Sequence, residues 1–266
     1  MRLIYNNVAD IATISATNLA SGSLDNLKNN RKSSVYRSLS SVTYTLTWGS
    51  PQLIKAVALP ATNLINGSTI EVKLYFGASV ITGGTKIIQA ASNRNVVLPG
   101  GNTTPLNYTH FSLGGATKTS IWFPNITTSS TKIEITLSNA NPIDCSRIVC
   151  GNYWEPKRQV SRGITLGIQD NSEVSTTRNG DTYINTTYTR ESMNFELQYF
   201  DDTDRKELLN IFRTWGSNNF IYVCVFPDET NSELMQTYSI YGRNSDFSMQ
   251  YDIVGLYTTS LNIESW

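Results

Sequence analysis

Among the side chains that could hold a metal or act as a base or nucleophile, the sequence has one histidine, three cysteines and 21 Asp and Glu. A single histidine, His110, excludes a metal site built from several histidines, and any Ser-His-Asp arrangement would depend on it alone. It lies within residues 107–112, where a half-exposed strand position explains it without catalysis. We therefore expect no catalytic residues and no enzymatic activity.

The three cysteines are odd in number and lack the spacing of a zinc site or a disulfide framework. Cys145 and Cys150 are separated by four residues with no second pair nearby, and Cys224 lies far along the chain. We expect all three to be reduced, buried thiols in a protein synthesised in the cytosol.

Three carboxylates, Asp201, Asp202 and Asp204, fall close enough together that they could hold Ca²⁺. The segment lacks the later glycine and the distal glutamate of an EF-hand loop. An N-terminal helix cap at Asp202 or Thr203 explains the same residues, and we favour it. A Gly-Gly-Thr-Lys stretch at residues 83–86 lacks the leading glycine of a phosphate loop. We expect no metal and no cofactor.

Aromatic rings are the remaining candidates for chemistry. A flat ring can cover the apolar face of a sugar while neighbouring Asn and Ser side chains bond its hydroxyls. The alternative is that the same rings fill the core of a β-sandwich, and we favour the core for each ring. The candidate glycan-contact residues are Trp48, Tyr75, Tyr108, Phe111 and Trp122.

Composition and charge limit the other classes of partner. The 266 residues are 39% hydrophobic and 16% charged, which fits one large β domain or two ordinary ones. The longest apolar run, residues 220–226, is far shorter than the ~20 residues that span a bilayer. No basic stripe is dense enough for nucleic-acid binding.

The net charge of zero hides an asymmetry along the chain. Residues 1–155 hold 12 Lys and Arg against 6 Asp and Glu, a net charge of +6; residues 156–266 hold 9 against 15, a net charge of −6. Opposite charges on two domains could steer neighbouring copies together. Composition drift between two solvated surfaces explains the numbers equally well.

The elements that position these residues are mostly short strands. Residues 68–76 alternate, with Ile70, Val72, Leu74 and Phe76 on one face. Similar runs separated by Gly and Pro turns predict an antiparallel sandwich or jelly roll in the first half and further strands in the second. The other predicted strands are 41–48, 54–59, 119–123, 132–137, 147–150, 164–168, 182–188, 194–200, 220–226, 247–254 and 257–263.

One helix is predicted, at about residues 202–215. Leu208, Leu209, Phe212 and Trp215 recur at helical spacing after an acidic start, and Gly216 is placed as a C-terminal cap. We expect its apolar face to pack on the second sheet.

Two stretches resemble known proteins. Asn26-Leu27 and Tyr36-Arg37-Ser38 resemble the early segment of discoidin-like jelly-roll domains. Residues 147–156, RIVCGNYWEP, are similar to the end of an N-terminal β-sandwich in tail proteins of long-tailed bacteriophages. The second half resembles the β-barrel with one α-helix of phage tail tube and distal tail proteins. In distal tail proteins the ring-forming domain often comes first, so the order here is reversed.

The resemblance implies an all-β fold in two domains, a discoidin-like jelly roll at 1–155 and a ring-forming β-barrel domain at 156–266. At the seam, Gly151 bends the chain, Tyr153 and Trp154 plug the underside of the sandwich, and Pro156 stiffens the exit.

The same resemblance implies a virion structural protein of the tail tip or baseplate, made in the host cytoplasm. It would form a hexameric or trimeric ring around the tail channel and link the tube to the hub or fibres. The alternative is a carbohydrate-binding module that recognises a host-surface glycan, and an enzyme such as a depolymerase comes third.

Overall fold

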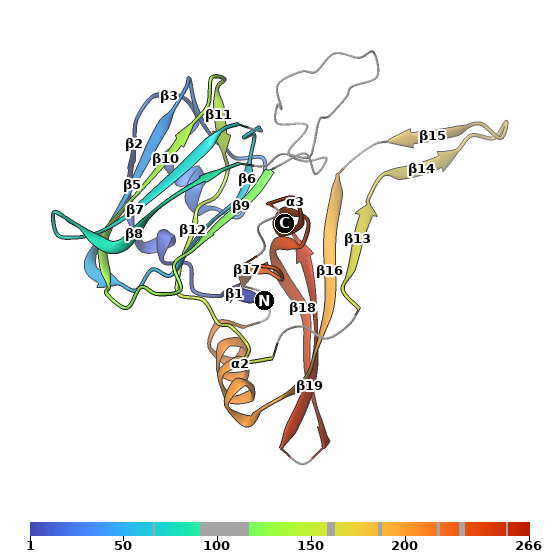
Figure 1. The fold of residues 1–266 in the computed structure, drawn as a ribbon. Helices are drawn as coiled ribbons and strands as arrows, with labels where there is room; N and C mark the ends of the chain where they lie inside the picture. The colour runs from blue at the N-terminus through green and yellow to red at the C-terminus, as the bar shows by residue number, and fades with distance from the viewer. Residues whose placement is uncertain are drawn as a thin grey trace.

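The computed structural model describes residues 1–65, 67–90, 117–158, 163–185, 188–216, 219–228, 232–253 and 255–266. Within these ranges the chain is an all-β protein with two α-helices and two short 3-10 helices. Figure 1 shows two parts side by side, a sandwich from the first half of the chain and a sheet with a helix from the second. The predicted fold class is confirmed at this level.

The first half forms two antiparallel sheets that enclose one apolar core. One sheet has the order β2 (Thr13–Ala16), β5 (Val42–Gln52), β10 (Ser130–Ser138), β7 (Thr69–Phe76), β8 (Ser79–Gln89). The other has the order β12 (Val149–Gly151), β6 (Ala56–Thr62), β11 (Ile143–Cys145), β4 (Tyr36–Ser38), β3 (Leu19–Ser21), with β9 (Thr117–Trp122) also paired to β6. The 3-10 helices η1 (Val8–Ile11) and η2 (Leu24–Lys28) lie beside these strands.

Side-chain alternation explains why these strands bury one face. In β7, Ile70, Val72 and Leu74 point into the sandwich core, as the sequence pattern predicts. Phe76, at the end of the same strand, is instead 55% exposed because it lies at the tip of the β7–β8 hairpin. The alternation therefore predicts the core face correctly until the strand reaches its turn.

The second half is one six-stranded sheet. Its order is β1 (Arg2–Ile4), β17 (Phe220–Cys224), β18 (Ser239–Ile253), β19 (Leu256–Ser265), β16 (Thr189–Phe200), β13 (Thr165–Asp170). In the described part of the chain the two edge strands do not pair with each other, so the expected barrel is not what these strands form. Helix α2 (Asp202–Trp215) covers one face of this open sheet with Leu208, Ile211 and Phe212.

Helix α2 matches its predicted bounds, but its N-cap is one residue earlier than expected. The Asp201 carboxylate, rather than Asp202 or Thr203, accepts a hydrogen bond from the Asp204 backbone N–H at 2.9 Å. Gly216 ends the helix with φ of 73° and donates its N–H to the Phe212 carbonyl at 2.9 Å. A second, short helix, α3 (Ser232–Thr237), was not predicted.

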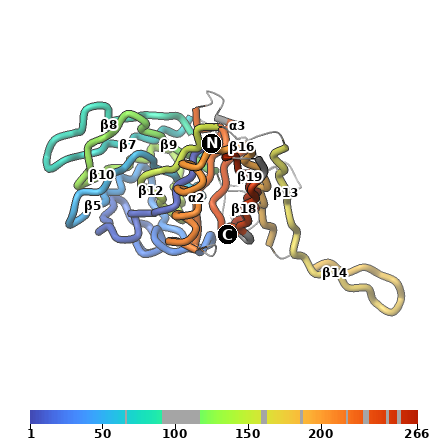
Figure 2. Tube along the Cα trace, turned by 90° about the horizontal axis from the view of Figure 1, so that it is seen from below, coloured from blue at the N-terminus to red at the C-terminus, as the bar shows by residue number. Residues whose placement is uncertain are grey.

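The other face of this sheet packs against the sandwich. Tyr222 and Cys224 of β17 meet Ala56, Ala58 and Trp122 of the first half in one buried cluster. Strand β6 is therefore buried along its whole length, with alternate residues facing the sandwich core and the second half. Figure 2, seen from below, shows the same close apposition of the two parts.

The first strand crosses between the halves. Although Arg2–Ile4 begin the chain, they pair with β17 in the sheet of the second half. The predicted boundary after residue 155 leaves this strand on the side of the sandwich. No local pattern in three residues reveals a partner more than two hundred positions away.

A two-stranded hairpin projects from the second half, and we name it the arm. It consists of β14 (Glu173–Thr176) and β15 (Thr182–Asn185), joined by a turn in which Gly180 has φ of 87°. Figures 1 and 2 show the arm extending away from both parts of the molecule.

Among the described helices, none has the length and apolar character needed to cross a membrane.

Candidate functional site

Two of the candidate glycan-contact rings lie in the interior. Trp48 is 8% exposed and donates its indole N–H to the Val8 carbonyl at 2.8 Å. Trp122 is 4% exposed and lies between the halves, with ring centroids 5.5 Å from Tyr153 and 6.4 Å from Tyr222. Both rings are buried, so the interior packing favoured from the sequence holds for them and the alternative of sugar stacking does not.

Tyr75 is half-buried, but its polar end is already occupied. Its hydroxyl donates to the Glu134 carboxylate at 2.7 Å, and the Lys132 ammonium lies 3.9 Å from the ring centroid. The hydrogen bond to Glu134, with a smaller effect of burial, raises the pKa of Tyr75 to about 12. Tyr108, Phe111 and His110 fall outside the described residues.

The seam residues divide between the two halves. Tyr153 packs in the cluster between them, as expected for a plug under the sandwich. Trp154 instead belongs to the core of the second half, where its indole N–H donates to Glu207 of α2 at 3.1 Å. Pro156 is buried, and Gly151 has φ of 155° with no room for a Cβ, which would lie 2.4 Å from the Asn6 carbonyl oxygen.

Ion pairs of one buried guanidinium join the same seam. Arg2 bonds Glu155 at 3.1 Å and Asp228 at 2.8 Å, and it lies over the rings of Trp122 and Tyr153. This guanidinium, which is almost wholly buried, ties the first strand to the seam. Such a network fixes the halves relative to each other.

The three cysteines are buried and free, in agreement with the expectation of reduced thiols. Burial raises the pKa of Cys145 to about 12 and also raises those of Cys150 and Cys224. Thiols in this state are poor nucleophiles.

The arm is exposed along both of its strands. Each residue of β14 and β15 is exposed. Val174 and Ile184 lie directly opposite each other in the register and are 66% and 58% exposed, while Tyr183 is 64% exposed on the other face. A hairpin with this much bare apolar surface is marginally stable in water unless something covers it.

The base of the arm is held by hydrogen bonds. The Asp170 carboxylate accepts from the Ser172 backbone N–H at 2.9 Å and from its hydroxyl at 2.6 Å. The Asn171 backbone N–H donates to the Tyr188 carbonyl at 3.1 Å. The Asn171–Tyr188 bond extends the β13–β16 ladder by one pair toward the arm, and the Asp170–Ser172 bonds fix the turn into β14.

Strand β13 has a bare edge beside the arm. In the described part of the chain it pairs with β16 along one side and with no strand along the other. Its apolar residues Leu166 and Ile168 are 42% and 78% exposed. An unprotected edge strand is a template for pairing with another chain.

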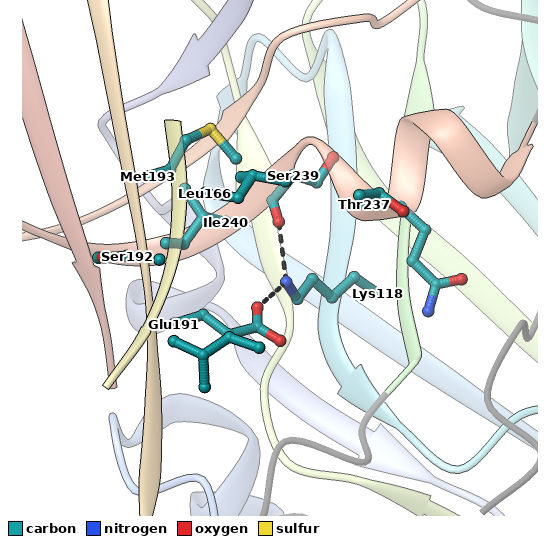
Figure 3. A pocket seen from close by; sticks show the side chains of 11 residues that line it. Lys118, Leu166, Glu191, Ser192, Met193, Thr237, Ser239 and Ile240 are labelled. Carbon is teal, nitrogen blue, oxygen red and sulfur yellow. Dashed lines mark hydrogen bonds and ion pairs between the residues drawn. The ribbon is translucent and has the colours of Figure 1, made fainter. Parts of the chain in front are cut away.

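A pocket of about 180 Å³ opens next to this edge, and we name it the β13 pocket. Four apolar residues, Leu166, Ile168, Met193 and Ile240, contribute to its lining. Lys118 of the sandwich reaches across its side, ion-pairs with Glu191 and donates to the Ser239 carbonyl at 3.0 Å (Figure 3). The pocket therefore combines an apolar floor with a paired charge at the junction of the halves.

An open hollow of about 490 Å³ lies at one end of the sandwich. The exposed ring of Phe76 and the side chains of Asn125, Thr127 and Thr128 contribute to its lining. The sequence analysis did not select Phe76, because the strand alternation placed it with the core residues Ile70, Val72 and Leu74.

Comparisons with known proteins give only remote likenesses. No protein-family model matches the chain, and no curated protein matches its sequence. Among solved structures, the lectin domain of lectinolysin complexed with Lewis b antigen is 13% identical, with a TM-score of 0.38 over 55% of this chain and 95% of that one. A chitosan-binding module from a Paenibacillus sp. IK-5 chitosanase/glucanase is 13% identical, with a TM-score of 0.35 over 55% and 99%.

A Ruminococcus gnavus fucosidase in complex with fucose is 11% identical, with a TM-score of 0.38 over 56% of this chain and 27% of that one. TM-scores at this level do not establish a shared fold. The assignment of a β-sandwich therefore rests on the strand pairing itself.

Proposed function

We propose that the chain is a structural subunit that assembles with copies of itself into a closed ring, and that this ring belongs to the tail tip or baseplate of a bacteriophage. The observation that supports assembly most directly is the arm, with Val174 and Ile184 exposed opposite each other. The subunit acts through shape and contacts and performs no catalysis.

Three features of the described residues support self-assembly. The arm exposes apolar side chains that gain free energy when another surface covers them. Strand β13 leaves an edge that can pair with a further strand. The two halves of the chain have net charges of +6 and −6, which favours contact between unlike halves of neighbouring copies.

The location in a phage tail rests on the sequence resemblance alone, including the seam around Tyr153 and Trp154. As proposed, a hexameric or trimeric ring surrounds the tail channel and contacts the tube, hub or fibre proteins. The discoidin-like character of the sandwich and the distal-tail-like character of the second half belong to the same proposal.

Light scattering coupled to gel filtration tests this function, followed by negative-stain imaging of any oligomer. We expect one defined oligomer with a central opening. The double variant V174S/I184S should shift the mass toward the monomer, whereas I87S, which changes a residue 64% exposed on the sandwich strand β8, should not. A wild-type chain that stays monomeric at every concentration, alone and with tail partners, contradicts the proposal.

A second candidate function is binding of a host-surface glycan, and the hollow beside Phe76 favours it. The exposed ring can cover the apolar face of a sugar, while the Asn125 amide and the hydroxyls of Thr127 and Thr128 can bond its hydroxyls. The two functions are compatible, since a ring can display its sandwiches outward.

A glycan array followed by calorimetry on any hit tests the second candidate. F76A should abolish the binding, and I87A should preserve it. Binding that F76A leaves unchanged, or an array without any hit, contradicts this role for the hollow.

A further inference from the structure

We propose that the β13 pocket and the adjacent bare edge of β13 form the docking site for the arm of a second copy of this chain. The inference rests on the proposed function, since it names the surface through which the copies meet. Its occupant is the β14–β15 hairpin of the neighbouring copy, which adds to the sheet as a further strand pair.

The backbone supports this pairing. Along its free side β13 presents backbone N–H and C=O groups over Thr165–Asp170. The arm has two outer edges of its own, because β14 and β15 pair only with each other in the described residues. Addition of a strand to a sheet edge satisfies both sets of groups at once.

The side chains are complementary as well. Leu166 and Ile168, both on the edge strand β13, belong to the apolar lining of the pocket and are themselves exposed. The volume of about 180 Å³ is comparable with the ~150 Å³ apolar cavity that accepts a benzene-sized molecule. One side chain of the size of Ile184 or Val174 therefore fits, and its neighbours cover the exposed Ile168.

The arm cannot reach the pocket of its own chain. Its base continues the β13–β16 ladder through the Asn171–Tyr188 hydrogen bond, and the Asp170–Ser172 bonds fix the turn beyond it. A strand that extends β13 along its own axis cannot fold back beside it without breaking this ladder. Figures 1 and 2 show the arm directed away from the body, so an arm that fills the pocket comes from another copy.

The contact has a direction, because the arm of one copy meets a different surface of the next, the β13 edge and its pocket. A contact between an arm and a different surface is head-to-tail. Such a contact produces a ring when the rotation that relates one copy to the next closes on itself. The same docking thus accounts for the closed oligomer proposed above.

Cross-linking of the full chain tests the site. In the double variant I168C/I184C, a short bifunctional maleimide should join neighbouring copies into a ladder that ends at the size of the ring. The native thiols are buried and do not compete. The control I87C/I184C places the first cysteine on β8, away from the pocket, and should give little ladder. Thermal unfolding of each variant checks that it is folded.

The outcomes separate the inference from the function on which it rests. A ladder with I168C/I184C, and little with I87C/I184C, supports the site. Equal ladders in both variants, or none in either, overturn it. Light scattering on the wild-type chain decides separately whether copies assemble, so a ring without this cross-link leaves the proposed function intact and moves the interface elsewhere.

Discussion

Leu3 and Trp154 exchange two backbone hydrogen bonds across the seam. The Leu3 N–H donates to the Trp154 carbonyl at 2.9 Å, and the Trp154 N–H donates to the Leu3 carbonyl at 2.8 Å. The first strand is thereby held between the seam and β17, in the sheet of the second half. The two halves share a strand, a buried cluster and the Arg2 ion network. We expect them to unfold as one cooperative unit.

Trp154→Ala tests this coupling. Loss of a buried indole from a core costs about 3–5 kcal/mol in unfolding free energy, and here it also removes the bond to Glu207 of α2. Urea unfolding followed by tryptophan fluorescence and by circular dichroism should give one coincident, lowered transition. Tyr183→Ala, on the exposed arm, should leave the midpoint nearly unchanged. Two separate transitions in the wild type would contradict the coupling.

Much of the fold follows from local sequence patterns, because alternation and helical spacing are local properties. The predictions for β7 and α2 succeed on the periodicity of Ile70–Leu74 and Leu208–Phe212. The pairing of β1 with β17 was missed because it depends on residues that are distant along the chain. The open sheet was missed for the same reason, since strand order is a long-range property.

The candidate site was harder to predict than the fold. The predicted strands at 164–168 and 182–188 correspond to β13 and, over Thr182–Asn185, to β15, but a strand pattern does not show whether its apolar residues meet a core. Ile168 and Ile184 look like core residues in the sequence and are exposed in the structure. Trp48 and Trp122 look like candidates for sugar stacking and are buried. Exposure is decided by tertiary packing, which one sequence does not contain.

Asp10→Ala should destabilise the fold because it leaves the buried Arg147 guanidinium without its carboxylate partner. Arg147 is 2% exposed, donates to Asp10 at 2.8 Å and bonds the Tyr241 hydroxyl of the second half at 3.1 Å. Removal of one partner of a buried ion pair costs roughly 3–5 kcal/mol, and the partly exposed Asp10 places the loss near the lower end. Urea midpoints should show this loss for D10A and almost none for D25A, which changes an exposed carboxylate. Equal midpoints would contradict the role of the pair.

Glu134 should contribute to acid sensitivity. The Lys132 ammonium, followed by the Tyr75 hydroxyl, lowers the pKa of Glu134 below its ordinary value of 4.5. At a pH between the lowered pKa of Glu134 in the folded chain and its ordinary pKa of 4.5 in the unfolded chain, the unfolded chain binds more protons. This contribution to stability is therefore complete above pH 4.5 and is lost as the pH falls through the folded pKa. E134Q should therefore lose less stability than the wild type between neutral pH and about pH 3, in urea titrations at each pH.

Glu173→Gln, at an exposed position of the arm, is the matched control for E134Q. It should keep the wild-type dependence of stability on pH. If the stability of E134Q depended on pH in the same way as that of the wild type, other carboxylates would account for the acid sensitivity.

The buried thiols should resist modification in the folded protein. Cys145, Cys150 and Cys224 are free and buried, and their raised pKa values leave almost no thiolate near neutral pH. An aromatic disulfide reagent should label none of them rapidly in buffer and all three in denaturant. Fast labelling of one thiol in the native protein would show that its part of the core opens readily.

The hydrogen bonds at the base of the arm should affect assembly of the copies but not folding of the chain. Asp170 fixes the turn into β14 by accepting two hydrogen bonds from Ser172, which lowers its pKa. D170A should leave thermal unfolding close to the wild type, because the residue is exposed, and should weaken the oligomer, because a loosely held arm loses more conformational freedom on docking. Light scattering over a dilution series should show dissociation at higher concentration for D170A than for the wild type or D25A. Unchanged dissociation in D170A would mean that the direction of the arm is not fixed by this turn.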